Sequence, residues 1–340
     1  MVARGGRFGY LSPTLSHLPT EERQTMTQRM KGVLAPVLTP VKPDLSADIG
    51  RFVRHCRWLL DNGCSGLAPF GTSSEANSFS TDERVAMLEA LVAGGIPAGQ
   101  LMPGTGCSAL SDTVRLTAHA MKLGCGGVLM LPPFYYKNIP DDGLYRYFAD
   151  VIERVGDARL QIYLYHIPQM ANVPLSLGLI ERLIKAYPST VVGIKDSAGD
   201  WNNTQALLKA FAPDFAIFTG KDAFLLQTLQ GGGAGCITAC ANVNPHGLSA
   251  LYQAARSTRA EEFQAQITKL VTLIDGRAYF VATYKGIVAQ YAADPGWLTV
   301  RPPILELTSQ QKNDLARDLT AFGFTMPGLD AADRHSRPAA

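Results

Sequence analysis

Eight short apolar runs recur along the chain between residues 32 and 240, and each is bounded by glycine, proline or polar residues. Each run is too short for a buried helix, and its hydrophobicity is continuous, which is typical of parallel strands covered on both faces. Helical patterns separate the runs. This order predicts an α/β fold, and eight strand-helix units predict a (β/α)8 TIM barrel. The runs are residues 33–38, 66–70, 101–104, 127–131, 162–165, 191–194, 215–218 and 235–238.

The helical segments between the runs carry their own start signals. Ser80-Thr81-Asp82-Glu83 has the spacing of a capping box, and Ser46, Pro140 and Ser176 precede three other helical stripes. A doubly wound open sheet has the same alternation of elements. No glycine-rich dinucleotide fingerprint follows the first run, so the closed barrel is favoured.

The rhythm changes after residue 240, where helical segments follow one another without strands. Residues 245–257, 259–273, 279–293 and 310–322 have this pattern. We therefore expect an N-terminal extension (1–31), a catalytic barrel (32–240), a C-terminal helical region (241–325) and a tail (326–340). The extension lacks the apolar core of a signal peptide. It is interpreted as a transit-like segment, a mobile extension or the result of a start site assigned too early.

Composition limits the partners of the chain. Lys and Arg number 31 and Asp and Glu 29, a net charge of +2 without a dense basic run, so no nucleic-acid partner is expected. No apolar stretch approaches the roughly 18 residues of a membrane span. The six cysteines lack the paired spacings of a zinc site, and the chain is too long and cysteine-poor for a disulfide scaffold. We expect free thiols in the cytoplasm.

Lys195 is the most informative polar residue, because it directly follows the apolar run 191–194. Catalytic groups of such barrels lie at the C-terminal ends of the strands, so the Lys195 amine should enter the barrel mouth. Burial there lowers the pKa of an amine and yields the neutral form that attacks a ketone. The alternative interpretation is a salt bridge from Lys195 to Asp196 or Asp200.

Other strand ends carry candidate groups. Tyr165 ends the fifth run, beside Lys195, where its phenol could exchange protons with an amine adduct, although a core tyrosine is the commoner case. The turn Gly71-Thr72-Ser73-Ser74-Glu75 offers hydroxyls and amides that suit a carboxylate. Lys221, after the seventh run, is the rival nucleophile, but its neighbour Asp222 favours an ion pair.

Four motifs occur in order at four strand ends. They are Gly71-Thr72-Ser73-Ser74-Glu75, Pro133-Phe134-Tyr135-Tyr136, Tyr165-His166-Ile167-Pro168 and Gly193-Ile194-Lys195-Asp196-Ser197. From about residue 32 to 324, the chain resembles the dihydrodipicolinate synthase / N-acetylneuraminate lyase family of pyruvate-dependent class I lyases.

The resemblance implies a role for each matching residue. Lys195 would be the Schiff-base lysine and Tyr165 the phenol that shuttles protons. Thr72 would link Tyr165 to Tyr136, which would reach the site from a neighbouring subunit. Thr72 and Ser73 would hold the keto-acid carboxylate, and Ile237 would line the pocket.

The activity implied is that of a cytoplasmic class I aldolase or lyase acting on a 2-keto acid, expected to be pyruvate, together with an aldehyde. No metal or organic cofactor is expected, because the iminium is itself the electron sink. A homo-oligomer, either a dimer or a tetramer, is expected. The alternatives are a 2-keto-3-deoxy sugar acid dehydratase, a non-catalytic barrel and a phosphosugar-binding barrel. The last is disfavoured because the glycine run 231–233 precedes the eighth run, at the opposite end of the barrel.

The chain also departs from the family pattern. Ser74 stands where many members have glycine, and Ala76 where many have serine. Met170 occupies the place of the arginine with which the lysine-pathway synthases grip their second substrate, and a thioether cannot pair with a carboxylate. Gly220-Lys221-Asp222-Ala223 replaces the Asp-Glu pair of the sialic acid lyases. These differences predict a second substrate other than aspartate semialdehyde, namely an uncharged or hydroxylated aldehyde, or an acidic sugar derivative if Lys221 turns inward.

Overall fold

The computed structural model describes residues 29–329. Most of the predicted extension and tail therefore lies outside the described residues, but the two boundary segments contact the barrel. The Met30 amide donates to the Tyr163 hydroxyl (2.7 Å), and Trp58 Nε1 donates to the carbonyl of Pro327 (2.9 Å). Residues 29–31 and 326–329 thus pack against the fold.

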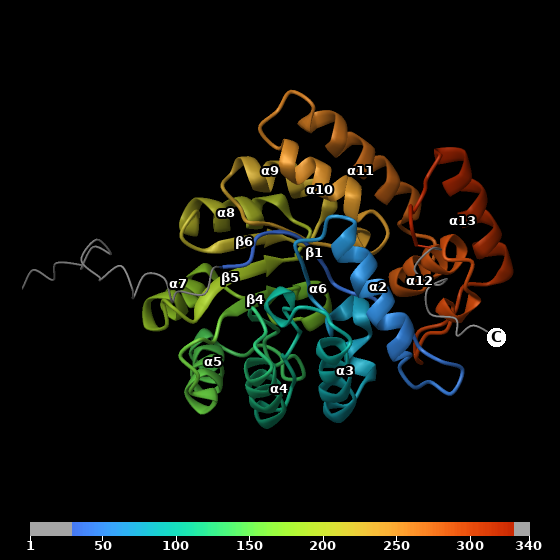
Figure 1. The fold of residues 1–340 in the computed structure, drawn as a ribbon. Coiled ribbons are helices and arrows are strands. Elements are labelled where there is room, and N and C mark those ends of the chain that lie inside the picture. The colour runs from blue at the N-terminus through green and yellow to red at the C-terminus, as the bar shows by residue number, and fades with distance from the viewer. Residues whose placement is uncertain (1–28, 330–340) are drawn as a thin grey trace, which may run out of the picture.

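A parallel sheet forms the centre of the molecule, with helices arranged around it (Figure 1). Its strand order is β2-β1-β7-β6-β5-β4-β3. The strands are β1 (Gly32–Ala35), β2 (Gly66–Leu67), β3 (Val128–Met130), β4 (Ile162–His166), β5 (Val191–Asp196), β6 (Ala216–Thr219) and β7 (Gly235–Ile237). This sheet and the solved relatives described below confirm the predicted barrel.

The third predicted run, residues 101–104, is not a regular strand. It makes single parallel bridges, from Leu101 to β2 and from Gly104 to β3. Pro103 has no N–H to donate to a ladder, and a Cβ at Gly104 would lie 2.2 Å from the Phe70 carbonyl oxygen. This segment nevertheless joins the two edge strands, because the Met102 amide donates to Leu67 and the Leu129 amide to Pro103.

Helices alternate with the strands, as the sequence pattern predicts. The capping box at Ser80 is confirmed, and the Ser176 hydroxyl accepts from the Leu179 amide. Asp48, not Ser46, caps the first barrel helix by accepting from the Arg51 amide (3.0 Å). The helices are α2 (Ile49–Asp61), α3 (Thr81–Ala93), α4 (Leu110–Lys122), α5 (Asp141–Val155), α6 (Pro168–Ala171), α7 (Leu177–Ala186), α8 (Trp201–Phe211), α9 (Leu225–Gln230) and α10 (Pro245–Ala254).

Three further helices follow without strands between them: α11 (Ala260–Ile274), α12 (Phe280–Tyr291) and α13 (Ser309–Phe322). They match the predicted C-terminal helical segments to within a few residues. Every residue of α12 from Val281 to Ala289 is buried, and α12 packs on α13 at one side of the barrel (Figure 1). None of the helices between residues 29 and 329 is long and apolar enough to cross a membrane.

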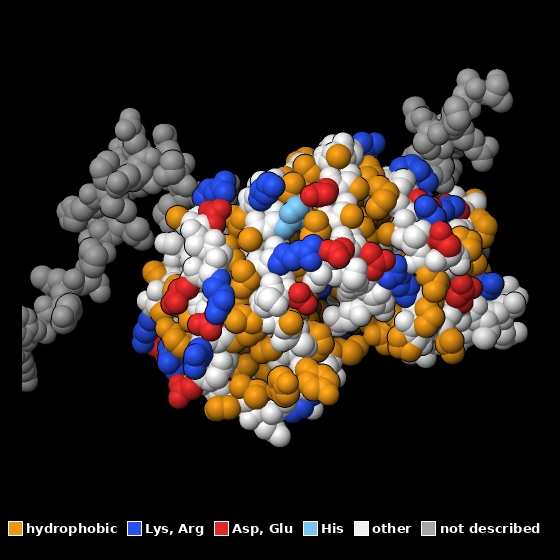
Figure 2. All heavy atoms as spheres, turned by 90° about the horizontal axis from the view of Figure 1, so that it is seen from below, with side chains coloured by type: hydrophobic (Ala, Val, Ile, Leu, Met, Phe, Trp, Pro, Cys, Tyr) orange, Lys and Arg blue, Asp and Glu red, His pale blue; other side chains and the backbone are white. Residues whose placement is uncertain are grey.

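The core has two layers that determine where a cavity can form. The larger layer lies between strands and helices, and the smaller fills the barrel interior with residues that include Leu34, Tyr163 and Phe218. The six cysteines are free, and all but Cys107 are buried. On the face in Figure 2, acidic and basic side chains are interspersed.

Candidate active site

A cavity of about 430 Å³ opens at the C-terminal ends of the strands. Five of the six predicted site residues line it: Thr72, Ser73, Tyr165, Lys195 and Ile237. Their convergence follows from the topology, because parallel strands bring their carboxyl ends to one edge of the barrel.

Lys195 and Tyr165 lie side by side because their strands pair in register, with Tyr165 opposite Lys195. Lys195 Nζ donates to the Tyr165 hydroxyl (3.2 Å) and lies 4.3 Å from the centre of its ring. The two residues are 5% and 3% exposed. The contact allows a proton to pass directly between the amine and the phenol.

No salt bridge to Lys195 exists among residues 29–329, so the salt-bridge alternative is wrong. Asp196 instead accepts from the Thr204 hydroxyl (2.6 Å) and the Ala198 amide (3.0 Å). Asp200 caps α8 by accepting from the Asn202 amide. With both carboxylates engaged elsewhere, the Lys195 amine faces the cavity beside the Tyr165 hydroxyl.

The turn after β2 brings its hydroxyls to the same cavity. Thr72 Oγ1 lies 3.4 Å from the Tyr165 hydroxyl, and Ser73 is buried beside it. Ser74 turns the other way and donates to the carbonyl of Val37. Thr72 and Ser73 can therefore offer donors to a ligand while Ser74 fixes the turn to the segment after β1.

Glu75, the last residue of this turn, connects it to the C-terminal helical region. It adopts a left-handed conformation (φ +57°), and its carboxylate is paired with Lys285 of α12. The Arg301 amide also donates to Glu75 (2.7 Å), and Lys285 donates to the Thr299 carbonyl (3.0 Å). Both side chains of the ion pair are 0% exposed. The C-terminal helical region is thus tied to the turn that carries Thr72 and Ser73.

The sixth predicted residue, Tyr136, does not line the cavity. It lies on the loop between β3 and α5, is 68% exposed, and packs edge-on against the ring of Tyr135 (5.3 Å between ring centres). A single described chain therefore does not bring Tyr136 to Lys195.

Residues after β4 form one wall. His166 points away from the cavity, as strand alternation predicts, and its Nδ1 accepts from the Leu175 amide (3.1 Å). Burial lowers the pKa of His166, with Asp196 opposing. Gln169 lines the cavity and donates to the Ser197 carbonyl (2.6 Å), and Met170 lines it with a half-exposed side chain.

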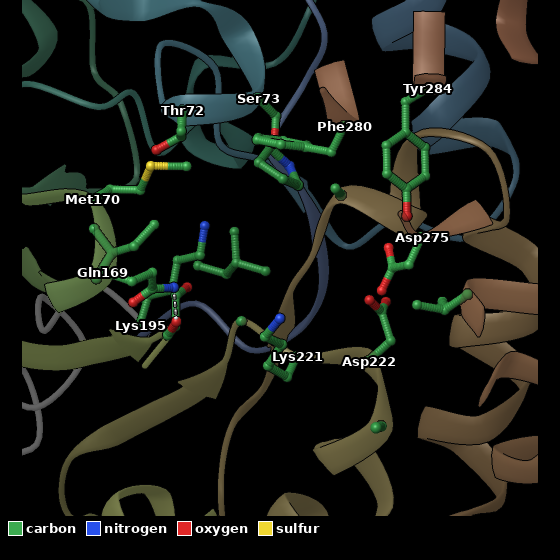
Figure 3. A pocket seen from close by; sticks show the side chains of 18 of the residues that line it. Thr72, Ser73, Gln169, Met170, Lys195, Lys221, Asp222, Asp275, Phe280 and Tyr284 are labelled. Carbon is green, nitrogen blue, oxygen red and sulfur yellow. Dashed lines mark hydrogen bonds between the residues drawn. The ribbon is translucent and has the colours of Figure 1, made fainter. Parts of the chain in front are cut away.

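The opposite side of the cavity includes Asp275 and Tyr284, which the sequence alone does not mark as site residues. Figure 3 shows Lys195, Gln169 and Met170 on one side, Asp222, Asp275 and Tyr284 on the other, and Lys221 between the two groups. Thr268 and Thr272 of α11 also line this side. The local sequence of α11 contains no signal for this position, because it depends on how the helical region packs on the barrel.

The predicted ion pair of Lys221 with Asp222 is wrong. No salt bridge of Lys221 exists among the described residues, and Oδ1 of the buried Asp222 makes no hydrogen bond within the same part of the chain. Burial raises the pKa of Asp222 to about 6, Asp275 adds to this rise, and Thr238 and Lys221 oppose it.

Known proteins resemble this chain along most of its length. Residues 29–322 match the dihydrodipicolinate synthetase family. An uncharacterized DapA-like lyase of Chloroflexus aurantiacus is 36% identical over 228 residues, which are 66% of this chain and 74% of that protein.

Solved structures share the fold. Dihydrodipicolinate synthase from Agrobacterium tumefaciens superimposes with a TM-score of 0.78 and 30% identity, covering 86% of this chain and 99% of that one. YagE, a prophage protein of the dihydrodipicolinic acid synthase family from E. coli K12 in complex with pyruvate, has a TM-score of 0.78, 25% identity and the same coverage.

Proposed function

This chain belongs to the dihydrodipicolinate synthetase family of lyases, and from that premise we propose that it forms a Schiff base between Lys195 and a 2-keto acid. The observation that carries the proposal is the buried Lys195 amine, which faces the cavity 3.2 Å from the Tyr165 hydroxyl and has no acidic partner among the described residues. The keto acid is pyruvate, the compound present in the YagE complex.

The reaction begins when the Lys195 amine adds to the ketone carbon and water leaves, which forms an iminium. Loss of a proton from the adjacent methyl group gives an enamine. Its carbon attacks the aldehyde carbon, and the aldehyde oxygen gains a proton to become a hydroxyl. Water then releases the longer 2-keto acid and regenerates the amine, and the lyase direction is the reverse. Tyr165 moves protons to and from these intermediates, supported by its contacts with Lys195 and Thr72.

Thr72 and Ser73 hold the keto-acid carboxylate. This role is supported by their place in the turn after β2, beside Tyr165, where two hydroxyls and the backbone amides line the same cavity. A carboxylate accepts several such donors well. Ile237, fully buried, forms the apolar wall near the adduct.

Tyr136 completes the site from a neighbouring copy of the chain, in a dimer or a tetramer. The exposed Tyr135 and Tyr136 on one loop support this, because large exposed aromatic side chains are typical of interfaces. Light scattering should give a mass of at least two chains. Replacing Tyr136 by Phe should reduce turnover while leaving the assembly intact. A monomer with full turnover would exclude the role.

We place the enzyme in the cytoplasm, since six free cysteines in an ordered fold suit a reducing compartment.

The experiment that tests the Schiff base is borohydride reduction in the presence of pyruvate, followed by peptide mass spectrometry. We expect the adduct on Lys195 and its loss in Lys195→Ala, with unchanged thermal stability because this strand-end side chain fills little core. Lys209→Met, on the outer helix α8, is the matched control and should keep the adduct. An adduct on Lys221, or none with several keto acids, would contradict the proposal. Release of pyruvate from a longer substrate separates the lyase from a dehydratase.

A further inference from the structure

The cavity is lined by two lysines, of which the proposed chemistry uses one. Lys221 Nζ makes no hydrogen bond and no ion pair within residues 29–329, although its neighbour Asp222 and the nearby Asp275 are both acidic. Its side chain extends over Gly199, in the loop after β5, where a Cβ would lie 3.0 Å from Lys221 Cε and 3.9 Å from Nζ. Gly199 therefore leaves room for the Lys221 side chain, which lines the cavity.

The strand register places Lys221 farther out than Lys195. Lys195 pairs with Phe218 of β6, and Lys221 lies three residues beyond Phe218. Lys221 therefore lies past the end of β6, on the mouth side of Lys195, in a turn where the Thr219 hydroxyl accepts from the Lys221 amide (3.0 Å). A ligand bonded to Lys195 reaches Lys221 only by its far end, which in the condensation product is the part contributed by the aldehyde.

The groups around Lys221 complete a polar subsite. Asp222 is 8% exposed and lines the cavity next to Lys221. A carboxylate in a cavity wall can accept hydrogen bonds from the hydroxyls of a ligand. Asp275 and the hydroxyl-bearing Thr268 line the same side from α11 and its C-terminal cap. These groups accept hydrogen bonds from hydroxyls, whereas Lys221 offers an ammonium to an anion or an oxygen.

We propose that Lys221 binds a terminal anionic group, a carboxylate or a phosphate, on a hydroxylated aldehyde whose hydroxyl donates to Asp222. The inference rests on the proposed function, because it takes Lys195 as the point of attachment. The sequence left open whether the second substrate is an acidic sugar derivative, which would require Lys221 to turn inward. The proposal favours such an acidic substrate, since Lys221 lines the cavity instead of pairing with Asp222. The condensation product is then a hydroxylated 2-keto acid with negative charge at both ends.

Longer keto acids test this directly, because they occupy the Lys195 end and the aldehyde end at once. Adduct formation is measured by borohydride trapping over a range of 2-oxoadipate and 2-oxohexanoate concentrations. These compounds have the same chain length and differ by the terminal carboxylate. We expect 2-oxoadipate to half-saturate at about tenfold lower concentration in the native enzyme, a modest factor because Lys221 lies at the exposed mouth.

Lys221→Met should abolish this preference, and Lys209→Met, which removes the same charge outside the cavity, should retain it. Trapping of pyruvate itself should be unchanged in both variants. The inference fails if native enzyme prefers neither the charged keto acid nor the phosphorylated aldehyde described below, or if Lys221→Met keeps whichever preference is found. Those results leave the Schiff base intact, whereas loss of all trapping in native enzyme would overturn the proposed function.

A second arm distinguishes the two kinds of anion. Condensation of pyruvate is compared between glyceraldehyde 3-phosphate and glyceraldehyde, in the native enzyme and in Lys221→Met. A phosphate site predicts that the variant loses about tenfold in kcat/KM for the phosphorylated aldehyde only. A carboxylate site predicts that the loss appears only in the keto-acid pair. Equal losses for charged and neutral members of both pairs would show that Lys221 does not recognise charge.

Discussion

The buried ion pair between Glu75 and Lys285 allows a sharp test of how the helical region supports the site. Glu75→Gln keeps the shape of the side chain but removes its negative charge, so the buried Lys285 ammonium is left with neutral acceptors only, the new amide oxygen and the Thr299 carbonyl. Both side chains of the pair are 0% exposed, so water cannot replace the lost carboxylate. We expect this variant to be the most destabilising single charge removal near the cavity.

The magnitude follows from the desolvation of a buried charge. Removing one partner of a buried pair costs about 3–5 kcal/mol, whereas replacing both partners by uncharged groups of similar volume is often close to neutral. Glu75→Gln should therefore lower the melting temperature by roughly 10 °C. The double variant Glu75→Gln with Lys285→Met should regain most of this loss. The Gly71–Glu75 turn should also loosen in the single variant, raising KM for pyruvate more than it lowers kcat.

The pH dependence of the melting temperature shows whether the loss of stability comes from the unpaired Lys285 ammonium or from misfolding. Burial lowers the pKa of Lys285, and Glu75 opposes this effect. Without Glu75 the pKa falls further, so the unfolded chain binds one more proton than the folded chain between the folded value and about 10.5. Stability then rises with pH in this window. The melting temperature of Glu75→Gln should approach that of the native enzyme as the pH is raised from 7 to 9.

Thermal unfolding of the native enzyme, both single variants and the double variant forms a cycle that isolates the interaction. The reasoning is refuted if Glu75→Gln costs less than about 1 kcal/mol, or if the double variant is as unstable as the sum of the singles. A deficit that does not change with pH would assign the loss to packing alone.

Three further predictions concern individual side chains. Tyr165→Phe should still form the trapped pyruvate adduct but turn over about 100-fold more slowly, and undiminished turnover would make Tyr165 a wall residue. The native enzyme should be a poor synthase with aspartate semialdehyde, and Met170→Arg should raise kcat/KM for this substrate about tenfold; efficient native activity would show that another cation replaces the arginine. Asp222→Asn should stabilise the fold by up to about 3 kcal/mol at pH 8 but by only about 0.5 kcal/mol at pH 4, because a carboxyl whose pKa rises from 3.8 to about 6 on folding opposes folding once it ionises. Melting curves at the two pH values test this last prediction, and an equal shift at both would contradict it.

The sequence predicts the barrel well because each strand and helix is recorded locally. Continuous apolar runs identify the strands, and capping residues such as Ser80 and Ser176 identify helix starts. The run at 101–104 has the same apolar character, yet a proline without an N–H and a close backbone approach at Gly104 reduce it to single bridges. Apolar character therefore predicts that a segment is buried. A regular strand also requires a free N–H at each ladder position and enough space between the backbones.

The residues of the candidate site also differ in how well the sequence predicts their positions. Lys195, Tyr165, Thr72, Ser73 and Ile237 line one cavity, as expected of residues at strand ends. Their catalytic roles stay predictions. The pairing of Lys221 with Asp222 was predicted wrongly because adjacent opposite charges suggest an ion pair, whereas the backbone directs Lys221 across Gly199 and buries Asp222. Sequence proximity does not determine side-chain direction.

The C-terminal helical region acts on both ends of the cavity through separate contacts. At the Lys195 end, the helical region fixes the turn that carries Thr72 and Ser73 without lining the cavity there, because Lys285 pairs with Glu75 of that turn. At the mouth it supplies wall residues directly, from α11 and from Tyr284 of α12. A substitution in the first set should therefore change the affinity for every keto acid, because it moves the turn that we propose holds their carboxylate. A substitution in the second set should change only the choice of aldehyde, so the two halves of the cavity can vary independently on one barrel.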